Sequence, residues 1–595
     1  MCQYALKGGR DLVKKVFRQM LLAQILSSMT VMICMLIDNI VIGRELGIDA
    51  MKAYELASPV LLIFAAIGTT LSAGVQVLCG KAMGRSDRKG TNECFSSAIA
   101  LALIIAGIGL FFVMIFTGPL CTMLGAGSAS PDNPVYDLTK RYLQGFIIGA
   151  PAFILAQISV PFLQMSGNRK MLVIAVVSMT GADIILDILN VMPFINGGMF
   201  GMGMASSISY YVALGIGMVV FLNKKFPFRF RLKHVRFKVF RKLLRYGLPT
   251  VVSQICFALL TYAINMILNN VDSRLGVAAY SVISTVGNIS FSVGNGIGAV
   301  AMMLASIFYS DEDRSSIRQV VKTMSFYALT VNAVLTAALA AVAWPVAKLF
   351  LTDHPDAVNM TTAGLRFFAL SLVPCGLNTA FRHFYQGVNR RVLTNLISVL
   401  QNLALTALFA FVLSRFWGTN GVWLAFLCGE SATFIVLSIL VFFKNNHRLN
   451  AEAYAMMRKD FGVAPENCLE MSVKSIADAE EAAARAAQFC AERDQDEQTC
   501  ATVARCVGEM SKNVVEHGFT ADGKEHSIDV RVWIKDDKKM VRIRDNCMAF
   551  DPVRYGEQHR FERSKSHAGI RTVMSAVADA KYVNALGLNN LTLVL

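Results

Sequence analysis

Charged residues are scarce in this 595-residue chain, where Asp, Glu, Lys and Arg together make up only 16%. Soluble globular domains carry about 25% charged residues. This low content excludes a chain that is soluble throughout. Hydrophobic residues account for 54% of the sequence, and the mean hydropathy is +0.49. Such a composition predicts several membrane-spanning segments.

Several chemical motifs are also missing. The thirteen cysteines form no Cys-x-x-Cys pair, and many lie within apolar segments. They are typical of small core residues in a reducing compartment, not of disulfides or a metal site. No Gly-x-x-x-x-Gly-Lys-Ser/Thr loop occurs, which disfavours primary ATP-driven transport. No phosphoacceptor-histidine motif is evident, which disfavours a histidine kinase.

The net charge of +16 does not indicate a nucleic-acid partner, because of where the basic residues lie. The densest basic run, residues 224–245, holds ten Lys/Arg and no acidic residue, and it falls between apolar segments. Phe, Leu and Val interleave with these charges. We therefore expect a loop that lies on the anionic headgroups of a lipid bilayer.

Twelve apolar segments are long enough to cross a bilayer, which takes about 20 helical residues. They are residues 19–43, 54–79, 93–117, 141–164, 170–191, 199–222, 247–270, 277–309, 323–350, 364–387, 392–415 and 419–443. The sequence thus predicts a polytopic all-α membrane protein of two six-helix lobes, followed by a soluble part. The expected boundaries are 1–18 for an N-terminal tail, 19–222 for the N-lobe, 223–246 for the basic loop, 247–443 for the C-lobe, 444–465 for a linker and 466–595 for the soluble part.

Lys and Arg residues set the expected orientation. They cluster before span one and after spans two, four, six, ten and twelve, whereas the alternate loops are poorer in them. The positive-inside rule then places both termini in the cytoplasm, with the chain crossing the cell membrane many times. Each half also has a Gly-rich segment near its second span, at 71–75 and 293–298. This spacing favours two repeated halves around a central cavity, as in many transporters.

Carboxylates are rare within the spans, so the exceptions are informative. Asp38 lies in the first span, and Asp183 and Asp187 lie four residues apart on one face of the fifth. All three fall at a comparable depth, where Ser206 of the sixth span can reach them. A carboxylate in hydrocarbon is costly unless it is protonated, paired or facing water. These residues predict a site for H⁺ or Na⁺, and the alternative is that Asp38 and Asp183 only cap helix ends.

The second half has its own acidic residue. Glu430 lies near the middle of the twelfth span, and amides on other spans accompany it: Gln254, Asn288, Asn295, Asn378 and Asn402. We expect Gln254, Asn378 and Glu430 to contribute to cation or substrate binding. Amides within spans more often join two helices by a hydrogen bond, and this alternative stays open.

Short motifs around these residues resemble the multidrug and toxic compound extrusion (MATE) family. They are Ile37-Asp38-Asn39-Ile40-Val41-Ile42-Gly43, Gly167-Asn168-Arg169-Lys170, the segments 182–187 and 201–206, Gly247-Leu248-Pro249 and the segment 418–425. The resemblance covers residues of about 15–445 and is specific as an ensemble.

The resemblance implies secondary antiport, in which H⁺ or Na⁺ enters while a small organic, often cationic, compound leaves. It also implies an N-lobe cation site at Asp38, Asp183, Asp187 and Ser206. Two departures stand out: the family usually has Asn where this chain has Asp183, and some branches carry an acid on the seventh span, where this chain has Gln254.

Beyond residue 466 the pattern alternates between strands and helices. Strands are expected over 469–473, 527–535, 540–544, 581–586 and 591–595, and helices over 476–493, 497–515 and 569–579. This part of about 130 residues predicts an α+β sandwich with its own core.

Three residues of the soluble part form a candidate nucleotide site. Glu509 and Asn513 are one turn apart on a helix, where Asn can hold Mg²⁺ and Glu can position a water or hydroxyl. Asp545 ends a strand, where it can accept from an adenine amino group. This set resembles the GHKL ATP-binding superfamily, closest to anti-sigma-factor serine kinases. The resemblance implies that Glu509 is the catalytic general base and Asn513 the metal ligand. It also implies that Asp545 recognises the adenine base and that Gly569 contacts the nucleotide.

The same resemblance has gaps. The superfamily's Asp-x-Gly-x-Gly is replaced by Asp545-Asn-Cys547-Met-Ala549, and its later Gly-x-Gly by His567-Ala-Gly569. Glycines let backbone approach a nucleotide closely, so their loss leaves turnover of ATP open. ATP and Mg²⁺ remain the expected ligands of this part of the chain. The alternative is a degenerate fold kept for docking a protein partner.

Two hypotheses for the whole chain follow. The first is an ion-driven efflux transporter whose tail senses nucleotide or binds a regulatory protein. The second is a membrane-anchored serine kinase or anti-sigma-like switch whose transporter half acts as a sensor.

Overall fold

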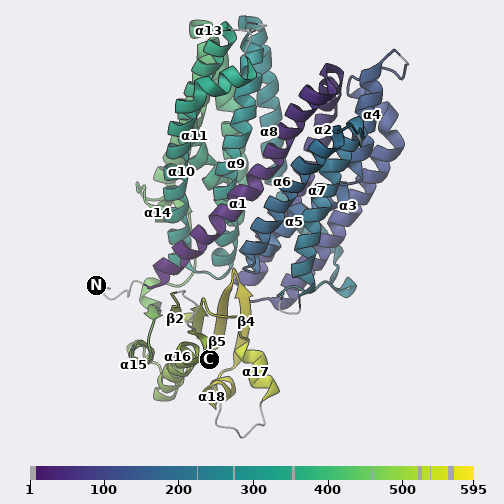
Figure 1. Cartoon of the computed structure of the whole chain (residues 1–595). Coiled ribbons are helices and arrows are strands. Elements are labelled where there is room, and N and C mark those ends of the chain that lie inside the picture. Colours follow the sequence, from purple (N-terminus) through teal and green to yellow (C-terminus); the bar gives the residue numbers. More distant parts are fainter. Residues whose placement is uncertain are drawn as a thin grey trace.

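A computed structural model of the protein describes residues 8–130, 132–193, 195–223, 226–272, 275–351, 355–458, 460–519, 525–535, 538–559 and 568–595. Two bodies of long helices stand side by side above a small domain of strands and helices (Figure 1). The helical bodies are the N-lobe and the C-lobe, and the small domain is called the tail below.

The described residues of the N-lobe form seven helices and one π-helical turn. They are α1 (Gly8–Val41) with the turn Ile42–Leu46, α2 (Ile48–Gly84), α3 (Arg88–Met123), α4 (Pro134–Ile147), α5 (Ala150–Met165), α6 (Arg169–Val191) and α7 (Gly198–Leu222). The α4 and α5 helices meet at a bend of 49° and together make one broken span. The Asp87 side chain accepts from the Gly90 N–H and so caps the start of α3.

The C-lobe begins after the basic loop. Its elements are α8 (Phe237–Asp272), α9 (Leu275–Ser310), α10 (Arg314–Phe350), α11 (Pro355–Gly387), α12 (Arg391–Val399), the π-helical turn Leu400–Ala404 and α13 (Leu405–Lys444). Gly418 interrupts α13, because its φ of +57° and ψ of −136° are not helical. A non-glycine residue would be strained there.

The number of spans agrees with the sequence. By length and composition ten of the described helices can cross a membrane, or eleven when α4 and α5 count as one span. The stretch Arg391–Lys444 counts once in that total although it has 54 residues, and one crossing needs about 20. Dividing it at Gly418 gives the predicted twelve. A multi-pass membrane protein is therefore confirmed.

The two lobes pack closely at the end that faces the tail. A Cβ atom added to Gly84 of α2 would come within 2.1 Å of the Ile307 carbonyl oxygen of α9. One residue earlier on α9, the Ser306 hydroxyl donates to the Gln76 carbonyl at 3.0 Å. Backbone thus meets backbone between the lobes, and small residues make that approach possible.

The tail is an antiparallel sheet with helices on one face. Its strands are β1 (Cys468–Val473), β2 (Ile528–Lys535), β3 (Lys538–Asp545), β4 (Asp579–Ala585) and β5 (Leu588–Val594), in the order β1-β2-β3-β5-β4. The helices are α15 (Ile476–Ala491), α16 (Glu497–Gly518) and α18 (Ala568–Ala576), which share one core with the sheet. Two shorter helices are α14 (Ala451–Ala455), in the linker, and α17 (Pro552–Gln558).

These layers confirm the predicted α+β sandwich, with strand and helix ends within a few residues of expectation. Two short helices, α14 and α17, were not expected from the sequence, because they have only five and seven residues. Two residues of the turn expected between β2 and β3, Asp536 and Asp537, lie outside the described residues. The assignment to the GHKL superfamily stays a prediction.

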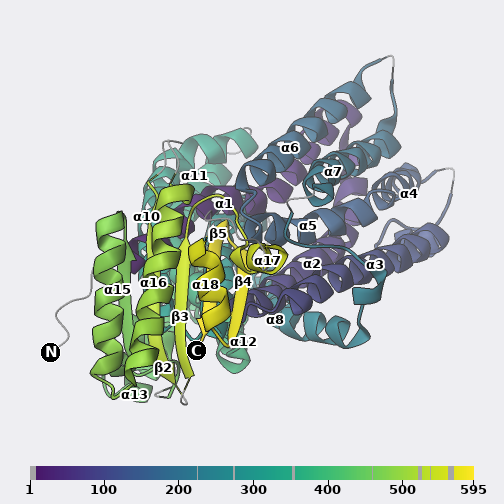
Figure 2. The same ribbon diagram turned by 90° about the horizontal axis from the view of Figure 1, so that it is seen from below.

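Both faces of the sheet are buried. Val530 and Val532 of β2 point into the helix-covered core, so the alternate residues Asp529 and Arg531 point to the opposite face. Seen from the tail side (Figure 2), the sheet lies across the region where the lobes meet, with α15 and α16 on the C-lobe side. The second face therefore packs against the membrane part.

Asp529 gives the tail a pH-dependent stability. Burial raises its pKa to about 6, a change that Asp313 and Glu470 reinforce and that Arg544 and Arg542 oppose. A raised pKa means that the folded tail binds a proton that the unfolded chain, with a carboxyl pKa of about 3.9, has already lost. The folded state therefore loses stability as the pH rises from about 4 to about 6.

We expect Asp529→Asn to stabilise the tail by about 2–3 kcal/mol at pH 8 and by about half as much at pH 5. The measurement is the thermal midpoint of the full-length protein at both pH values. Asp579→Asn, which changes an exposed carboxylate paired with Lys581, is the control. An equal gain at both pH values would contradict this account.

Candidate functional site

Three carboxylates from two helices of the N-lobe converge in the protein interior. Asp38 comes from α1, and Asp183 and Asp187 come from successive turns of α6. Their ligand oxygens all lie within 4.8 Å of one another, and all three residues are buried. The structure thus brings together the three acids that the sequence suggested would share one level.

Few polar groups satisfy these carboxylates. Tyr54 donates its hydroxyl to Asp38 Oδ2 at 3.3 Å. Among the described residues no side chain hydrogen-bonds to either oxygen of Asp183 or Asp187, and no cationic side chain forms a salt bridge with the three acids. Ser206 and a second α7 residue, Ser209, lie beside Asp183. The cluster is therefore rich in oxygen ligands and poor in compensating charge.

Tyrosines that the sequence analysis did not single out surround the acids. Tyr54 and Tyr142 pack edge to face with ring centroids 5.2 Å apart, and Tyr210 is buried next to the same carboxylates. Aromatic residues are common in spans, so nothing in their spacing marked them. Their hydroxyls give the site additional oxygen atoms.

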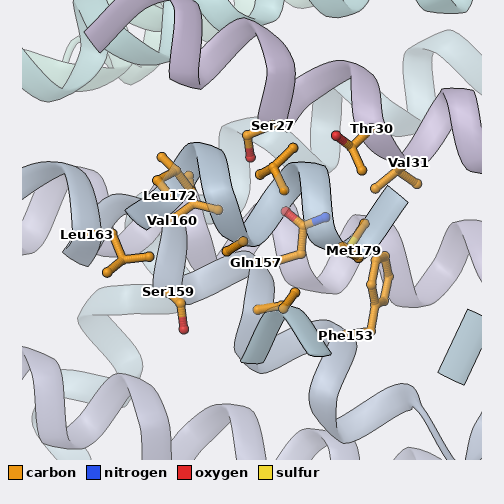
Figure 3. Close-up of a pocket in the computed structure, with 14 residues that line it drawn as sticks. Ser27, Thr30, Val31, Phe153, Gln157, Ser159, Val160, Leu163, Leu172 and Met179 are labelled. Carbon is orange, nitrogen blue, oxygen red and sulfur yellow. The ribbon is translucent and has the colours of Figure 1, made fainter. Parts of the chain in front are cut away.

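A pocket lies in the same lobe, between α1, α5, α6 and α7 (Figure 3). Its walls are mostly apolar, and Phe153 and Met179 are among the larger side chains. Ser27 and Gln157 supply polar groups. Met179 precedes Asp183 by one helical turn. The pocket and the carboxylate cluster are therefore built on the same helices.

The buried acid of the C-lobe, Glu430, is hydrogen-bonded by neighbouring amides. Asn378 of α11 donates to Glu430 Oε2 at 2.7 Å and to the Glu430 carbonyl at 2.8 Å. Gln401 donates to Glu430 Oε1 at 3.3 Å. Both carboxylate oxygens are hydrogen-bonded, unlike those of Asp183 and Asp187. Gln401 was not among the expected residues, and it lies on the π-helical turn Leu400–Ala404, a rare geometry that often marks functional positions.

The structure does not bring Gln254 into this cluster. Gln254 is exposed on α8, and its neighbour Ser253 points inward, where Asn402 donates to its hydroxyl at 2.7 Å. Arg382 also donates to Ser253. One residue along a helix is a rotation of about 100°, so Gln254 and Ser253 point in different directions. A role for Gln254 in binding stays a prediction.

In the tail, Glu509 and Asn513 lie on α16 as expected, and Gly569 lies close to Glu509. A Cβ atom on Gly569 would come within 2.2 Å of Glu509 Oε2, so the carboxylate lies against the first turn of α18. Glu509 is exposed and Asn513 is half-buried.

Asp545 is 4% exposed. Its Oδ1 accepts from Asn589 Nδ2 at 2.8 Å and from the Cys547 N–H at 2.9 Å. Burial raises its pKa.

These tail residues do not fit a nucleotide in the way that the GHKL resemblance implies. An adenine reader needs a carboxylate that faces an open pocket, whereas Asp545 is enclosed. Cys547 stands where the superfamily has its first glycine, and its sulfur is 3.1 Å from a Cβ added to Gly518. His567 lies outside the described residues. Binding of ATP and Mg²⁺ here stays a prediction.

We expect Asn378→Leu to lower the stability of the protein by about 1–3 kcal/mol, because it leaves a buried Glu430 oxygen without its donor. The thermal midpoint of the purified protein measures this effect. Gln254→Leu is the matched control and should change the stability by less than about 0.5 kcal/mol, since Gln254 is exposed. Equal losses for both variants would show that Asn378 does not stabilise Glu430.

Comparisons with known proteins agree with this architecture. The MatE family model matches residues 23–189 and 249–412, one range in each lobe and together more than half of the chain. The probable multidrug resistance protein YoeA of Bacillus subtilis is 21% identical over 356 residues, which are 58% of this chain and 76% of that protein. The FAD transporter of Shewanella oneidensis is 23% identical over 410 residues, 67% of this chain and 89% of its own.

Solved structures show the same fold. An outward-facing MATE family transporter superimposes with a TM-score of 0.66 at 18% identity, covering 71% of this chain and 94% of its own. The Vibrio cholerae MATE transporter VcmN in its bent form gives 0.65 at 16% identity, covering 72% and 95%. With two lobes, a broken fourth span and one family match in each lobe, this chain belongs to the multidrug and toxic compound extrusion (MATE) family of efflux transporters.

Proposed function

We propose that this protein is a secondary antiporter that exports a small organic, often cationic, compound in exchange for H⁺ or Na⁺. The coupling site is the N-lobe cluster of Asp38, Asp183 and Asp187 with Ser206. The observation that carries this proposal is the convergence of three buried carboxylates within 4.8 Å without a salt-bridge partner among the described residues.

The chemistry of the cluster explains why it would take up an ion. Three ionised carboxylates at this spacing repel one another, and each has lost its hydration. A proton on one of them, or a Na⁺ ion between them, removes part of both penalties. Carboxylate, hydroxyl and carbonyl oxygens are the ligands that hard cations prefer, so the donor set suits either ion.

The pocket beside the cluster is the proposed binding site of the exported compound. An organic cation bound near Met179 would be stabilised by the same negative charges that attract H⁺ or Na⁺. Binding of the compound and binding of the ion would then oppose each other, and such competition is what an antiporter requires. The largely apolar lining suits compounds that combine an apolar body with a cationic group.

The C-lobe cluster is a second polar contact in this scheme. Because Asn378 and Gln401 already hydrogen-bond to the Glu430 carboxylate, Glu430 is held in one orientation. We assign Glu430 and Asn378 to substrate or cation binding in the C-lobe, and alternating access of the two lobes carries the cargo across.

The tail regulates transport in this proposal and does not drive it. The orientation expected from the basic loops places it, with both termini, in the cytoplasm. A nucleotide or a regulatory protein is its proposed ligand, and no transport step goes through bound ATP.

We expect an imposed proton gradient or sodium gradient to drive dye movement in proteoliposomes without nucleotide. The gradient that drives dye movement identifies the coupling ion as H⁺ or Na⁺. Asp187→Asn should reduce this gradient-driven transport by at least about tenfold, because it removes one ion-binding carboxylate. Asp137→Asn, on the exposed face of α4, is the matched control. Undiminished transport by Asp187→Asn would remove the cluster as the coupling site.

For the tail, we expect the wild-type protein to bind a fluorescent ATP analogue weakly, and Cys547→Gly to bind it about tenfold more tightly, a difference of about 1.4 kcal/mol. The glycine restores the space that the buried thiol takes. Asn513→Ala in the Cys547→Gly background should weaken the gain, because it removes the proposed metal ligand. Identical titrations for wild type and Cys547→Gly would contradict the idea that Cys547 blocks the site.

A further inference from the structure

Arginines on the second face of the tail sheet are buried against the C-lobe. Arg542 and Arg544 of β3 both contact Asp311, and Arg542 Nη2 also lies 2.9 Å from Asp313 Oδ2. Arg531 of β2 approaches Asp313 at 3.8 Å. None of the three arginines is more than 4% exposed. We call these five residues the arginine anchor.

The charges of the arginine anchor depend on one another. Burial alone would raise the pKa of Asp313, but Arg542, Arg531 and Arg544 together hold it below the ordinary value of a carboxyl. Asp313 also caps α10 by accepting from the Ser316 N–H at 3.0 Å. Buried ion clusters of this kind are strongly destabilised when one partner is removed. The tail is thus held firmly to the loop between α9 and α10.

A second contact joins the tail to the N-lobe. The Leu586 N–H donates to the Met165 carbonyl at 2.6 Å, and Arg169 Nη2 donates to the Leu586 carbonyl at 2.6 Å. Gly167 and Gly587 both have positive φ, +79° and +74°, and a Cβ on Gly167 would come within 2.7 Å of Gly587 Cα. The β4–β5 turn therefore fits the loop between α5 and α6, and we call this contact the turn anchor.

Apolar packing reinforces the turn anchor. Val583, Ala585, Leu586 and Leu588 of the β4–β5 hairpin are buried in the same hydrophobic cluster as the membrane helices. An exposed ion pair adds to it, since Arg88 after α2 lies 3.1 Å from Asp551 before α17. One rigid sheet thus contacts loops of both lobes at the same end of the molecule (Figures 1 and 2).

We propose that the tail is an inter-lobe clamp: it holds the tail-side ends of the two lobes together, and transport requires it to release one lobe. The inference rests on the proposed function, because alternating access makes the lobes separate at this end. A sheet cannot stretch between two lobes that move apart, so one anchor opens in each cycle.

The turn anchor is the one that opens. The linker ties the tail to the C-lobe as well, since Tyr385 donates to the Tyr454 carbonyl at 2.7 Å and Arg390 to the Met456 carbonyl at 2.9 Å. The C-lobe side therefore has the buried ion cluster and the linker. The N-lobe side has two backbone-directed hydrogen bonds, the hairpin and two exposed polar contacts, Arg88 with Asp551 and Lys15 with the Glu525 carbonyl. Ligands that change the contact at Leu586 would set the transport rate.

The experiment compares full-length variants in proteoliposomes. Arg169→Ala weakens the turn anchor, and Asp579→Ala, at an exposed ion pair of the tail, is the control. We expect Arg169→Ala to speed initial dye transport by about three- to tenfold. Without the Arg169 hydrogen bond, opening of the turn anchor takes less free energy, and the released state is more populated. Hydrogen exchange at residues 586–588 should rise in the same variant and stay unchanged in the control.

Asp311→Arg tests the arginine anchor, because it opposes Arg542 and Arg544 directly. Should it fold poorly, the charge swap Asp311→Arg with Arg544→Asp restores opposite charges and should return both exchange and transport towards wild type. Faster exchange at residues 586–588 with unchanged or slower transport would overturn the clamp. Absence of gradient-driven transport in the wild type as well would instead overturn the proposed function, while the exchange data would still report whether the anchors hold.

Discussion

A charge that leaves water must be compensated, and this constraint shapes the three polar clusters of the molecule. In the arginine anchor, three guanidinium groups surround two carboxylates, so the compensation is internal and the contact is strong. In the C-lobe, amides hydrogen-bond both oxygens of Glu430. In the N-lobe, three acids have mainly one another, a tyrosine and two serines. Among the polar clusters of the described residues, the last one lacks compensating charge, and for that reason we propose it as the site of the transported ion.

Close backbone contact is the second constraint, and it explains how the lobes and tail fit together. Gly84 meets the Ile307 carbonyl between the lobes, and Gly167 meets Gly587 between lobe and tail. Such contacts either fit or do not, because packed backbones cannot deform gradually. Ile307 is also only four residues from Asp311 of the arginine anchor. Separation of the lobes at this point therefore acts directly on the loop that holds the tail.

Most of the fold and part of the site could be predicted from the sequence. The lengths of the apolar segments predicted the membrane spans. The spacing of Asp183 and Asp187 predicted that both lie on one helix face, because helical geometry is local. The sequence alone does not distinguish the exposed Gln254 from its buried neighbour Ser253, because one position along a helix changes the face. The pairing of Arg542 with Asp311 was out of reach: the two residues are 231 positions apart, and neither charge looks unusual in its own segment. Contacts between distant segments follow from packing, which local patterns do not contain.

Reciprocity links the clamp to the coupling site and brings the two hypotheses for this chain together. If the docked tail favours one arrangement of the lobes, then an ion or compound that favours the other arrangement must weaken docking by the same free energy. A ligand that binds at Asp187 would then change the exposure of Leu586 and of its neighbours in the β4–β5 hairpin. The tail would restrain transport and at the same time report on it. A partner that recognises the released β4–β5 hairpin would report the state of the transporter. A transporter with a regulatory tail and a sensor with a signalling tail are then two descriptions of the same protein.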